Sequence, residues 1–433
     1  MLFGKIGIIF KTNCSRFFCP SKKNAIKLIQ GILKGNASLK AIAKGCIDKR
    51  APSSFARFLH ESVWEPFELN RARLLYFQKL KQLRAVKQGI ISIDDYISEK
   101  SGENIKSAGW HYSHSKHRTI LGQNVVVLQY WDDKKDYPIN YGVYMNKKCC
   151  EKEGRSFKTR LEIASELIND AHSCGISGQT VVMDSWYVSK KFIDELTGLG
   201  YHWVGRLKSN RICYENGVRL NLRELGKLIP DNLWRKARLP YPSSEKKDDG
   251  NLQYICCRSV ELSGLGKIKV VFVKKSLDAP IKLFLGSDRF DLTGSDLLCI
   301  YAHRWRIETF FRDCKQNLNL SGYMGRSYIG FEKFLYLVFT AYCFIKYLSL
   351  IGHWGRNALK RCLTFGEALD NYHQLCLECF VCVIYDVSFE IGNKSELLSY
   401  FRKKFYTRSN EKLSHFNDHV FYDLKSDILA YVG

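Results

Sequence analysis

The segment YAHRWRIETFFRDCK, residues 301–315, carries one acid among cations on a repeating pattern. Tyr301, Arg304, Glu308 and Lys315 follow one another at steps of three, four and seven residues. A helix of about 3.6 residues per turn places such positions on one face. An acid flanked by cations can hold a metal ion and bind phosphates. A solvated face with ion pairs would show the same pattern, so the segment alone leaves both interpretations open.

The remaining large side chains of this segment suit the interior of a protein. Trp305, Ile307, Phe310 and Phe311 fall away from the polar face, and we expect them to pack inward. We also expect one helix to begin near Gly294 and to run without interruption through the whole segment.

The charge of the chain indicates a polyanionic partner. Its 433 residues include 67 Lys and Arg against 43 Asp and Glu, a formal net charge of +24. With 45% hydrophobic and 25% charged residues, the composition is that of a globular protein. The basic residues are spread along the sequence, which favours a long footprint on DNA or RNA over an acidic membrane surface.

Cysteine usage and hydropathy favour a cytoplasmic protein. The 16 cysteines show no framework spacing, so we expect a reducing compartment and mostly free thiols. The apolar N-terminus is broken by Lys5 and Lys11, and no small-residue cleavage site follows, which argues against a signal peptide. The long apolar run at residues 334–352 contains Lys346, and it predicts a buried core helix with no membrane partner.

The N-terminal part, residues 1–88, reads as a helical DNA-binding domain. Residues 22–33 form one amphipathic segment, Ser38 can cap a short helix, and Pro52 can begin another. Two short helices joined by a brief turn resemble a helix-turn-helix. A small helical bundle with surface charges is the alternative. Residues 64–83 are expected to continue as a further helix.

At Gly89 the periodicity changes to that of an α/β core with an antiparallel front. The expected strands cover residues 90–93, 124–131, 137–144, 179–183 and 201–207, and the expected helices cover residues 158–172 and 190–199.

The rest of the chain divides into three predicted regions. Residues 208–290 are rich in Gly and Pro between short alternating runs, and they predict a mainly β insertion with a charged loop at 243–250. Residues 291–352 return to the core that began with residues 89–207. Residues 353–433 read as a helical, basic C-terminal region.

Three acids stand out by their context. Asp94 follows an apolar β run, Asp184 follows VVM, and Glu308 lies on the polar face of its helix. A carboxylate directly after a buried strand lies at a sheet edge, and two of these plus one from a helix form a hard-oxygen cage for Mg²⁺ or Mn²⁺. Two such ions, about 3.5–4 Å apart, can cleave a phosphodiester. A single strand-end Asp is usually a cap or turn residue, but three acids in a basic chain favour the metal site.

At this point the chain resembles the DDE transposases of bacterial insertion sequences. Within them it resembles the group with a Y-x2-R-x3-E-x6-K signature, which Tyr301, Arg304, Glu308 and Lys315 match in spacing. The supporting motifs are IDDYISEKSG, WHYSHSK, MDSWY, RLKSNR, RWRIETFFRDCKQNLNL and GRS. The resemblance covers roughly residues 20–350.

The resemblance implies an RNase H-like catalytic core that binds two divalent ions, Mg²⁺ or Mn²⁺, through Asp94, Asp184 and Glu308. It also implies a β insertion between the second Asp and the Glu. The adjacent Asp95 stays open as an alternative to Asp94. Many relatives have Thr or Ser two places after the first acid, where this chain has Tyr96 or Ile97.

The implied activity is cut-and-paste transposition, with hydrolysis at the element ends followed by attack of the freed 3′-hydroxyl, in some relatives through a hairpin. The implied partners are the terminal inverted repeats, target DNA and a second copy of the chain in the paired complex, at the bacterial nucleoid. The residues implied to contact DNA are Tyr301, Arg304, Lys315, Lys208, Asn210 and Arg211. The alternatives are an RNase H-fold nuclease without strand transfer and a non-catalytic DNA-binding protein derived from a transposase.

One further pattern lies in the C-terminal region. His373, Cys376, Cys379 and Cys382 recur at every third position. On a helix this spacing is typical of a stripe of buried thiols, and a zinc site is the alternative.

Overall fold

The computed structural model describes residues 19–36, 38–46, 50–102, 104–113, 116–239, 252–351 and 364–406. The expected loop at 243–250 lies outside these residues, as do the chain before residue 19 and the predicted tail beyond 406.

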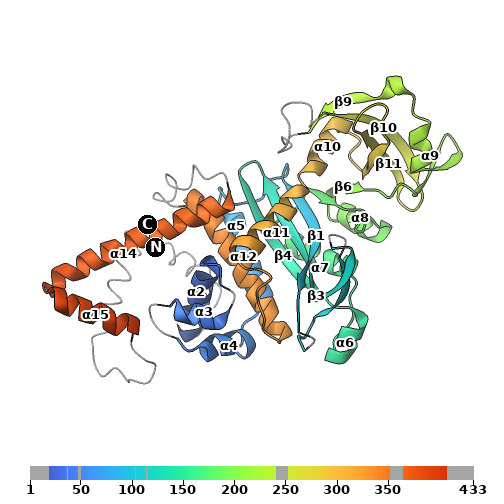
Figure 1. Cartoon of the computed structure of the whole chain (residues 1–433). Coiled ribbons are helices and arrows are strands. Elements are labelled where there is room, and N and C mark those ends of the chain that lie inside the picture. Colours follow the sequence, from blue (N-terminus) through green and yellow to red (C-terminus); the bar gives the residue numbers. More distant parts are fainter. Residues whose placement is uncertain are drawn as a thin grey trace.

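A mixed sheet of twelve strands forms the centre of the described part of the chain (Figure 1). Its core half has the order β4-β3-β1-β5-β6, in which β1, β3 and β4 are antiparallel and β1, β5 and β6 are parallel. The antiparallel front predicted from the sequence is therefore confirmed. These strands are β1 (Ile90–Glu99), β3 (Arg118–Asp132), β4 (Lys135–Tyr144), β5 (Thr180–Met183) and β6 (His202–Arg206).

The second half of the sheet is built from the segment predicted to be mainly β. Strand β12 pairs antiparallel with β6, so this segment continues the core sheet instead of forming a separate one. A short helix, α9 (Leu222–Lys227), lies among its strands. The other strands of the sheet are β2 (Gly109–Ser113), β7 (Ile212–Glu215), β8 (Val218–Asn221), β9 (Arg235–Arg238), β10 (Leu252–Leu262), β11 (Gly266–Lys274) and β12 (Ile281–Ser287).

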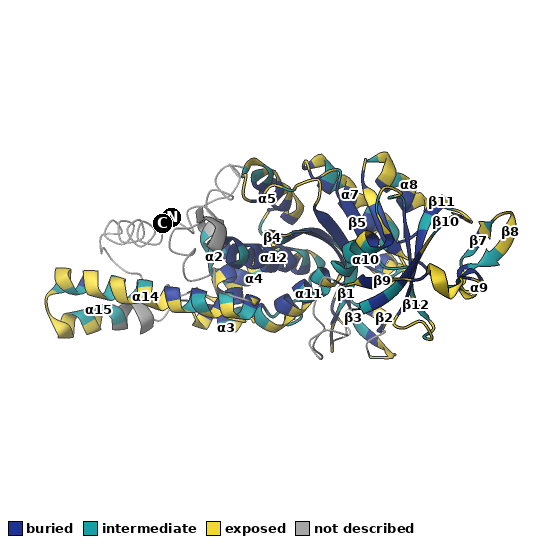
Figure 2. Ribbon diagram, turned by 90° about the horizontal axis from the view of Figure 1, so that it is seen from above, coloured by how far each residue is buried: buried dark blue, intermediate teal, exposed yellow. Residues whose placement is uncertain are grey.

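Helices cover both faces of the core half (Figure 2). The run VVVL in β3 is buried on both sides, and its residues alternate between two apolar clusters. Val125 and Val127 pack on the side of α11 (Trp305–Asn317) and α12 (Tyr328–Ile351). Val126 and Leu128 pack on the side of α7 (Arg160–Ser173) and α8 (Lys190–Gly198).

The N-terminal helices share their core with α11 and α12. Helices α2, α3 and α4 contribute to the same apolar cluster as α11 and α12, and Ser38 caps α3 as expected. The helix expected over residues 64–83 is shorter, because α5 begins with Pro66 at its first turn and ends at Lys79. Trp64 precedes it and donates its indole N–H to the carbonyl of Phe58. The bounds are α2 (Cys19–Leu33), α3 (Leu39–Lys44), α4 (Pro52–His60) and α5 (Pro66–Lys79).

Helix α12 contains the long apolar run of the sequence. Among the described residues it is the one helix long and apolar enough to cross a membrane, but 83% of the relevant window is buried inside the protein. It packs against α2, α4, β4 and α14 (Phe365–Ile391), which is the arrangement of a core helix. The remaining helices are α6 (Lys147–Glu153), α10 (Gly294–Ala302), α15 (Lys394–Tyr406) and a 3₁₀ turn at Asp231–Leu233.

The expected stripe of buried thiols on α14 is wrong, because none of its three cysteines is buried. Cys376 and Cys382 are exposed and Cys379 is partly exposed, because α14 leaves the core beyond Leu375. No group of three His, Cys, Asp or Glu that could hold a metal ion is found among the described residues, so the structure gives a zinc site no support there.

A partly buried acid on α12, Glu332, lies where the N-terminal helices meet the core. Burial raises the pKa of the Glu332 carboxyl to about 7, although the Tyr328 hydroxyl and Arg155 oppose the shift. The neighbouring Lys333 donates to the carbonyl of Ser62 in the N-terminal segment. Because of its raised pKa, the Glu332 carboxyl becomes charged in this water-poor environment only when the pH rises through about 7.

We predict that Glu332→Gln makes folding stability less dependent on pH. The pKa of Glu332 in the folded state exceeds that in the unfolded chain. The contribution of the neutral Glu332 carboxyl to the free energy of unfolding is therefore complete below about pH 4.5 and is lost as pH rises through about 7. Between these limits the loss is up to about 3 kcal/mol. Urea unfolding of both proteins at pH 5 and pH 8 measures it, and parallel pH profiles would contradict the prediction.

Candidate active site

The parallel pairing of β1 with β5 brings the first two acids together. The paired residues run from Ile90 with Thr180 to Ile93 with Met183. Asp94 and Asp184 are the next residues on the two strands, so they are adjacent at the point where β5 ends. Asp184 does follow its strand, as expected. Asp94 does not, because β1 continues to Glu99 through its pairing with β3.

Asp94 and Asp95 point to opposite faces of the sheet, since side chains alternate along a strand. Asp94 faces α11, where the guanidinium of Arg304 lies 2.9 Å from its carboxylate. Asp95 faces α7 and accepts hydrogen bonds from Asn124, at 2.7 Å, and from the Tyr187 hydroxyl, at 3.2 Å. Of these two acids, Asp94 shares the face of the sheet on which Glu308 lies.

The helix expected to run without interruption from Gly294 to Lys315 is broken. Helix α10 ends at Ala302, two residues form a tight turn, and α11 begins at Trp305. The backbone N–H groups of His303 and Arg304 bond to carbonyls three residues back, and the His303 ring stacks on Trp131 at 3.7 Å.

The break changes where the signature residues lie. Tyr301 is on α10, Arg304 is the residue before α11, and Glu308 and Lys315 are in the first and last turns of α11. Trp305, expected to be buried, is exposed because it opens α11, while the three other apolar residues of the segment pack inward.

Arg304 joins two of the three acids. Its guanidinium pairs with Asp94 and with Glu308, and about a fifth of the Arg304 side chain is exposed. Burial raises the pKa of the Asp94 carboxyl to about 7; the charge of Arg304 acts against this shift, and the nearby Asp95 and Asp184 add to it. The positive charge of Arg304 therefore stabilises the charged forms of the two carboxylates, Asp94 and Glu308, with which it pairs.

The other two signature residues border this cluster. Burial raises the pKa of the Tyr301 phenol. The charges of Arg304 and Arg206 oppose this shift, and the charge of Asp184 adds to it. The Lys315 ammonium lies 5.1 Å from the centre of the Tyr96 ring. Tyr96 lies two residues after Asp94, and its ring packs on Phe311 at 4.9 Å.

The carboxylates of this cluster are the type of ligand that suits a divalent ion, but they are too far apart in this structure to bind one ion together. Asp94, Asp184 and Glu308 supply the carboxylate oxygens that Mg²⁺ and Mn²⁺ prefer. Among the described residues no three acids lie close enough to hold a metal ion. Arg304 lies between Asp94 and Glu308 as a stand-in cation, and an ion on these two acids requires its guanidinium to move.

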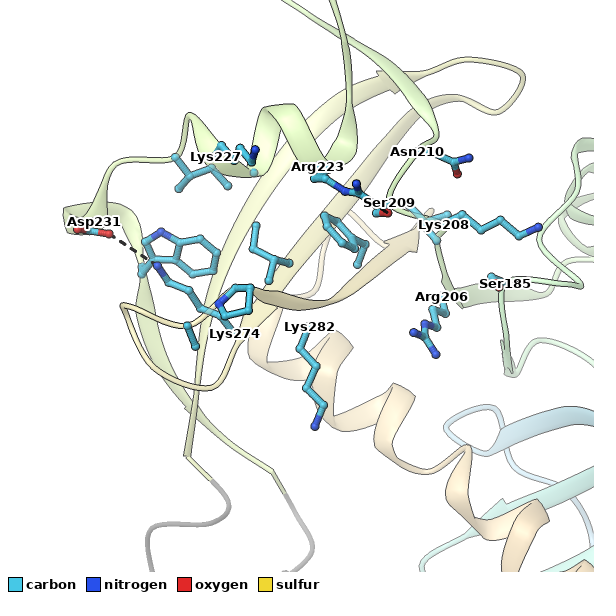
Figure 3. Close-up of a pocket in the computed structure, with 18 residues that line it drawn as sticks. Ser185, Arg206, Lys208, Ser209, Asn210, Arg223, Lys227, Asp231, Lys274 and Lys282 are labelled. Atoms are coloured by element: carbon cyan, nitrogen blue, oxygen red, sulfur yellow. Dashed lines mark hydrogen bonds and ion pairs between the residues drawn. The ribbon is translucent and has the colours of Figure 1, made fainter. Parts of the chain in front are cut away.

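A groove of about 790 Å³ opens beside the cluster. It starts at Ser185, next to Asp184, and extends over the second half of the sheet (Figure 3). Lys208 and Asn210 lie toward Ser185, and Lys227 and Asp231 lie at the far end. The basic side chains in its lining are Arg206, Lys208, Arg223, Lys227, Lys274 and Lys282, and Asp231 is the acid of the lining.

The far end of the groove has a more ordered wall. The Lys274 ammonium lies 4.1 Å from the Trp234 ring, donates to the carbonyl of Leu277 and lies 3.7 Å from Asp231. Lys227 and Lys282 also line the groove and are exposed, so their charges are accessible to a ligand.

Two of the three residues expected from RLKSNR to contact DNA lie at the groove, and their role as DNA contacts stays a prediction. Lys208 and Asn210 line the groove, whereas the Arg211 guanidinium donates to the carbonyl of Val188 and is absent from the lining. Sequence reasoning missed Arg206, Arg223, Lys227, Trp234, Lys274 and Lys282. Their signal is weak, because they are scattered over some seventy-five positions in a chain that is basic throughout.

Two families match this chain. Residues 34–227 match the DDE superfamily endonucleases, and residues 154–344 match the transposase DDE domain. The two matches overlap and contain Asp94, Asp184 and Glu308 between them. They support a DDE enzyme that cleaves nucleic acid, and more particularly a DDE transposase. The mixed α/β sheet is consistent with the RNase H-like core of such enzymes. No curated protein matches the chain.

We predict that Arg304→Met lowers the free energy of unfolding by about 1–3 kcal/mol, because Asp94 and Glu308 lose their shared cation. In an Asp94→Asn background the same change should cost clearly less, since one of the two charges is gone. Denaturant unfolding of the four proteins gives the coupling.

Arg312→Met is the matched control, because the Arg312 side chain is 56% exposed and its loss should change stability by less than about 0.5 kcal/mol. An equal cost of Arg304→Met in both backgrounds would show that the pairing with Asp94 contributes nothing.

Proposed function

We propose that the protein is the transposase of an insertion sequence, acting by cut-and-paste transposition through the Tyr301, Arg304, Glu308 and Lys315 signature. The observation that carries this proposal is the adjacency of Asp94 and Asp184 across β1 and β5, with Glu308 linked to Asp94 through Arg304. The two family matches support the same class.

Asp94, Asp184 and Glu308 would hold the divalent ions. When bound, Mg²⁺ or Mn²⁺ supplies the activation of a hydroxyl nucleophile and the stabilisation of the leaving oxygen. Asp94 is well suited to bind a cation, because its carboxylate is largely shielded from water and its charged form is unfavourable unless a positive partner is near. Asp95 is held on the opposite face by Asn124 and Tyr187, so we assign the first acid to Asp94.

The cations of the cluster position the phosphodiester. Once its guanidinium leaves the two acids, Arg304 can bind a phosphate with two parallel hydrogen bonds. Lys315, on the same helix as Glu308, adds a point charge, and the Tyr301 hydroxyl donates to a phosphate oxygen. The three residues thus fix the scissile bond next to the acids, which is how phosphoryl-transfer sites gain much of their rate.

The groove beside Asp184 extends this substrate site. Its cations line one continuous path that begins next to the acids, and a strand of DNA leaving the cleavage point would place its phosphates there. Lys208 and Asn210 contact the strand near the acids, and Lys227 and Lys282 contact it further along. In the synaptic complex two copies would act on paired terminal repeats and a target.

Two alternatives lead to different products. An RNase H-fold nuclease would cleave DNA without joining it, and a non-catalytic relative would bind DNA without cleaving it. Joining a pre-cut element end to a target plasmid separates the first alternative from a transposase, and metal-dependent cleavage excludes the second. If short inverted repeats bracket the gene, they are the natural ends for this assay, and finding them would itself favour the transposase.

We predict that Asp94→Asn and Asp184→Asn each lower Mg²⁺-dependent cleavage of those ends by about 10³-fold or more. Asp95→Asn is the matched control, because it removes a neighbouring carboxylate on the opposite face, and it should keep activity within about tenfold. Cleavage lost in Asp95→Asn and kept in Asp94→Asn would move the first acid to Asp95.

We predict that replacing Lys208, Lys227 and Lys282 together by Gln weakens DNA binding and flattens its salt dependence. Each lost phosphate contact reduces the slope of log K against log salt by about 0.9, so the triple variant should be shallower by about 2–3. Titrations at several salt concentrations measure the slope.

The control for this prediction replaces Lys147, Lys148 and Lys152 of α6 by Gln. These lysines are exposed and far from the groove lining, and their loss lowers the net charge by the same amount. An equal change of slope in both triple variants would mean that net charge acts, and that the groove does not.

A further inference from the structure

Two sequence motifs lie side by side, apart from the acids and the groove. The first residues of WHYSHSK lie on β2, and GRS lies in the loop that joins α11 to α12. The Lys106 N–H donates to the carbonyl of Arg326 at 3.0 Å and joins the two segments. The buried Lys100 ammonium donates to the carbonyls of Ser321 and Tyr323, at 3.1 and 2.6 Å. The loop that carries Arg326 is therefore fixed to the residue that follows β1.

The register of the sheet places the aromatic residues of the first motif on the face of Asp94. Asp94 pairs with Val127 of β3, and Trp110 pairs with Leu121 of β3. Directly paired residues point to the same side, and residues an even number of positions apart share a face. Tyr112 lies two positions beyond Trp110 and shares that face as well. The six positions from Val127 to Leu121 place Trp110 about 20 Å from Asp94 along the sheet.

Trp110 and Tyr112 present two large aromatic side chains to solvent. They are 62% and 53% exposed, whereas Gly109, His111 and Ser113 between and beside them are buried. Strand β2 stands at the end of the strand order, beside β3 (Figure 2), so a ligand can reach this face. Neighbouring exposed rings of this size mark an interaction site.

Exposed cations beside the rings indicate a polyanionic ligand. Lys106 and Arg326 are both exposed. Gln123, two positions from the β3 residue that pairs with Trp110, donates to the carbonyl of Lys106 at 3.3 Å, so the segments of both cations lie beside the rings. Phosphates bind to cations and unpaired bases stack on aromatic rings, a combination typical of proteins that bind single strands. A second copy of this chain, with its net charge of +24, suits such a surface poorly.

The spacing of the two rings favours unpaired bases. Residues two positions apart on a strand are about 6.6 Å apart. Consecutive bases of a duplex strand are about 3.4 Å apart and are already stacked on each other. A single strand can extend until each ring receives one base, so a single strand fits the rings and a duplex does not.

We propose that Lys106, Trp110, Tyr112 and Arg326 form a binding site for single-stranded DNA, in which the rings stack on unpaired bases and the cations bind phosphates. We call these four residues the β2 platform. The platform lies along β1 and β3 from the acids, whereas the groove extends across the strands toward β12, so the two sites take different parts of a substrate. The single strand is inferred from exposure, register and charge, and the choice of DNA over RNA rests on the proposed function.

The experiment measures the binding of fluorescent oligo(dT) of about twelve nucleotides to the full-length protein in EDTA, by anisotropy at several salt concentrations. Trp110→Ala combined with Tyr112→Ala should lower the affinity by about tenfold or more at every salt concentration, with an unchanged salt slope, because stacking releases no counterions. Lys106→Gln combined with Arg326→Gln should instead make the slope of log K against log salt shallower by about 1.4, since each phosphate contact of a single strand contributes about 0.7.

Two controls separate stacking from a general loss of structure. Trp110→Phe combined with Tyr112→Phe keeps both rings and should bind oligo(dT) within about threefold of the wild type. Tyr385→Ala combined with Phe389→Ala removes two rings of α14 that are 62% and 70% exposed, and it should bind like the wild type. All these side chains are exposed, so the midpoint of urea unfolding should stay unchanged in each variant.

Four results would overturn the proposal. The first is unchanged oligo(dT) binding by the alanine variant of the platform, which would leave a protein partner for the rings. The second is an equal loss of affinity for a blunt duplex, which would mean that the rings do not receive unpaired bases. The third is an unchanged salt slope in the Lys106 and Arg326 variant. The fourth is tighter binding of oligo(U) than of oligo(dT), which would replace DNA by RNA. Cleavage by Asp94→Asn and Asp184→Asn tests the proposed function separately, so the two can fail independently.

Discussion

The parallel pairing of β1 with β5 is the interaction on which the rest of the site depends. It ends at Ile93 and Met183, and the next residue on each strand is an acid. Because β1 continues along β3 while β5 stops, Asp94 is fixed by a backbone ladder and Asp184 by the strand that leads into it. Two carboxylates are thereby held side by side, and their mutual repulsion and burial create the need for a cation.

The cation in this structure is Arg304, and the break between α10 and α11 is what places it there. In a continuous helix, Arg304 and Glu308 would lie one turn apart on a common face, with Tyr301 in line. The turn at residues 303–304 instead brings the Tyr301 phenol close enough to Asp184 for an electrostatic interaction. It also lets the Arg304 guanidinium pair with both Glu308 and Asp94. The apolar side of α11, through Phe310 and its neighbours, anchors the helix in the shared core.

The same sheet links the acids to the basic groove. Strand β12 pairs with β6, which pairs with β5, so the groove walls are set in register with Asp184. This continuity explains how cations that are distant in sequence form one path beside the acids. Helix α14 lies at the opposite end of the molecule from the second half of the sheet, over which the groove extends (Figure 1).

Local patterns in the sequence determined the elements and the residue types. The apolar runs before Asp94 and Asp184, the alternating strands and the Tyr301 to Lys315 spacing depend on neighbours within a few residues, and side-chain periodicity reports such neighbours directly. The sequence favoured Asp94 over Asp95 because Asp94 directly follows the apolar run, but it could not show that the two side chains face different helices. It also missed the break before α11, the groove cations and the exposed thiols of α14. Each of these depends on contacts between segments far apart in the chain, such as His303 with Trp131, and only the tertiary structure decides them.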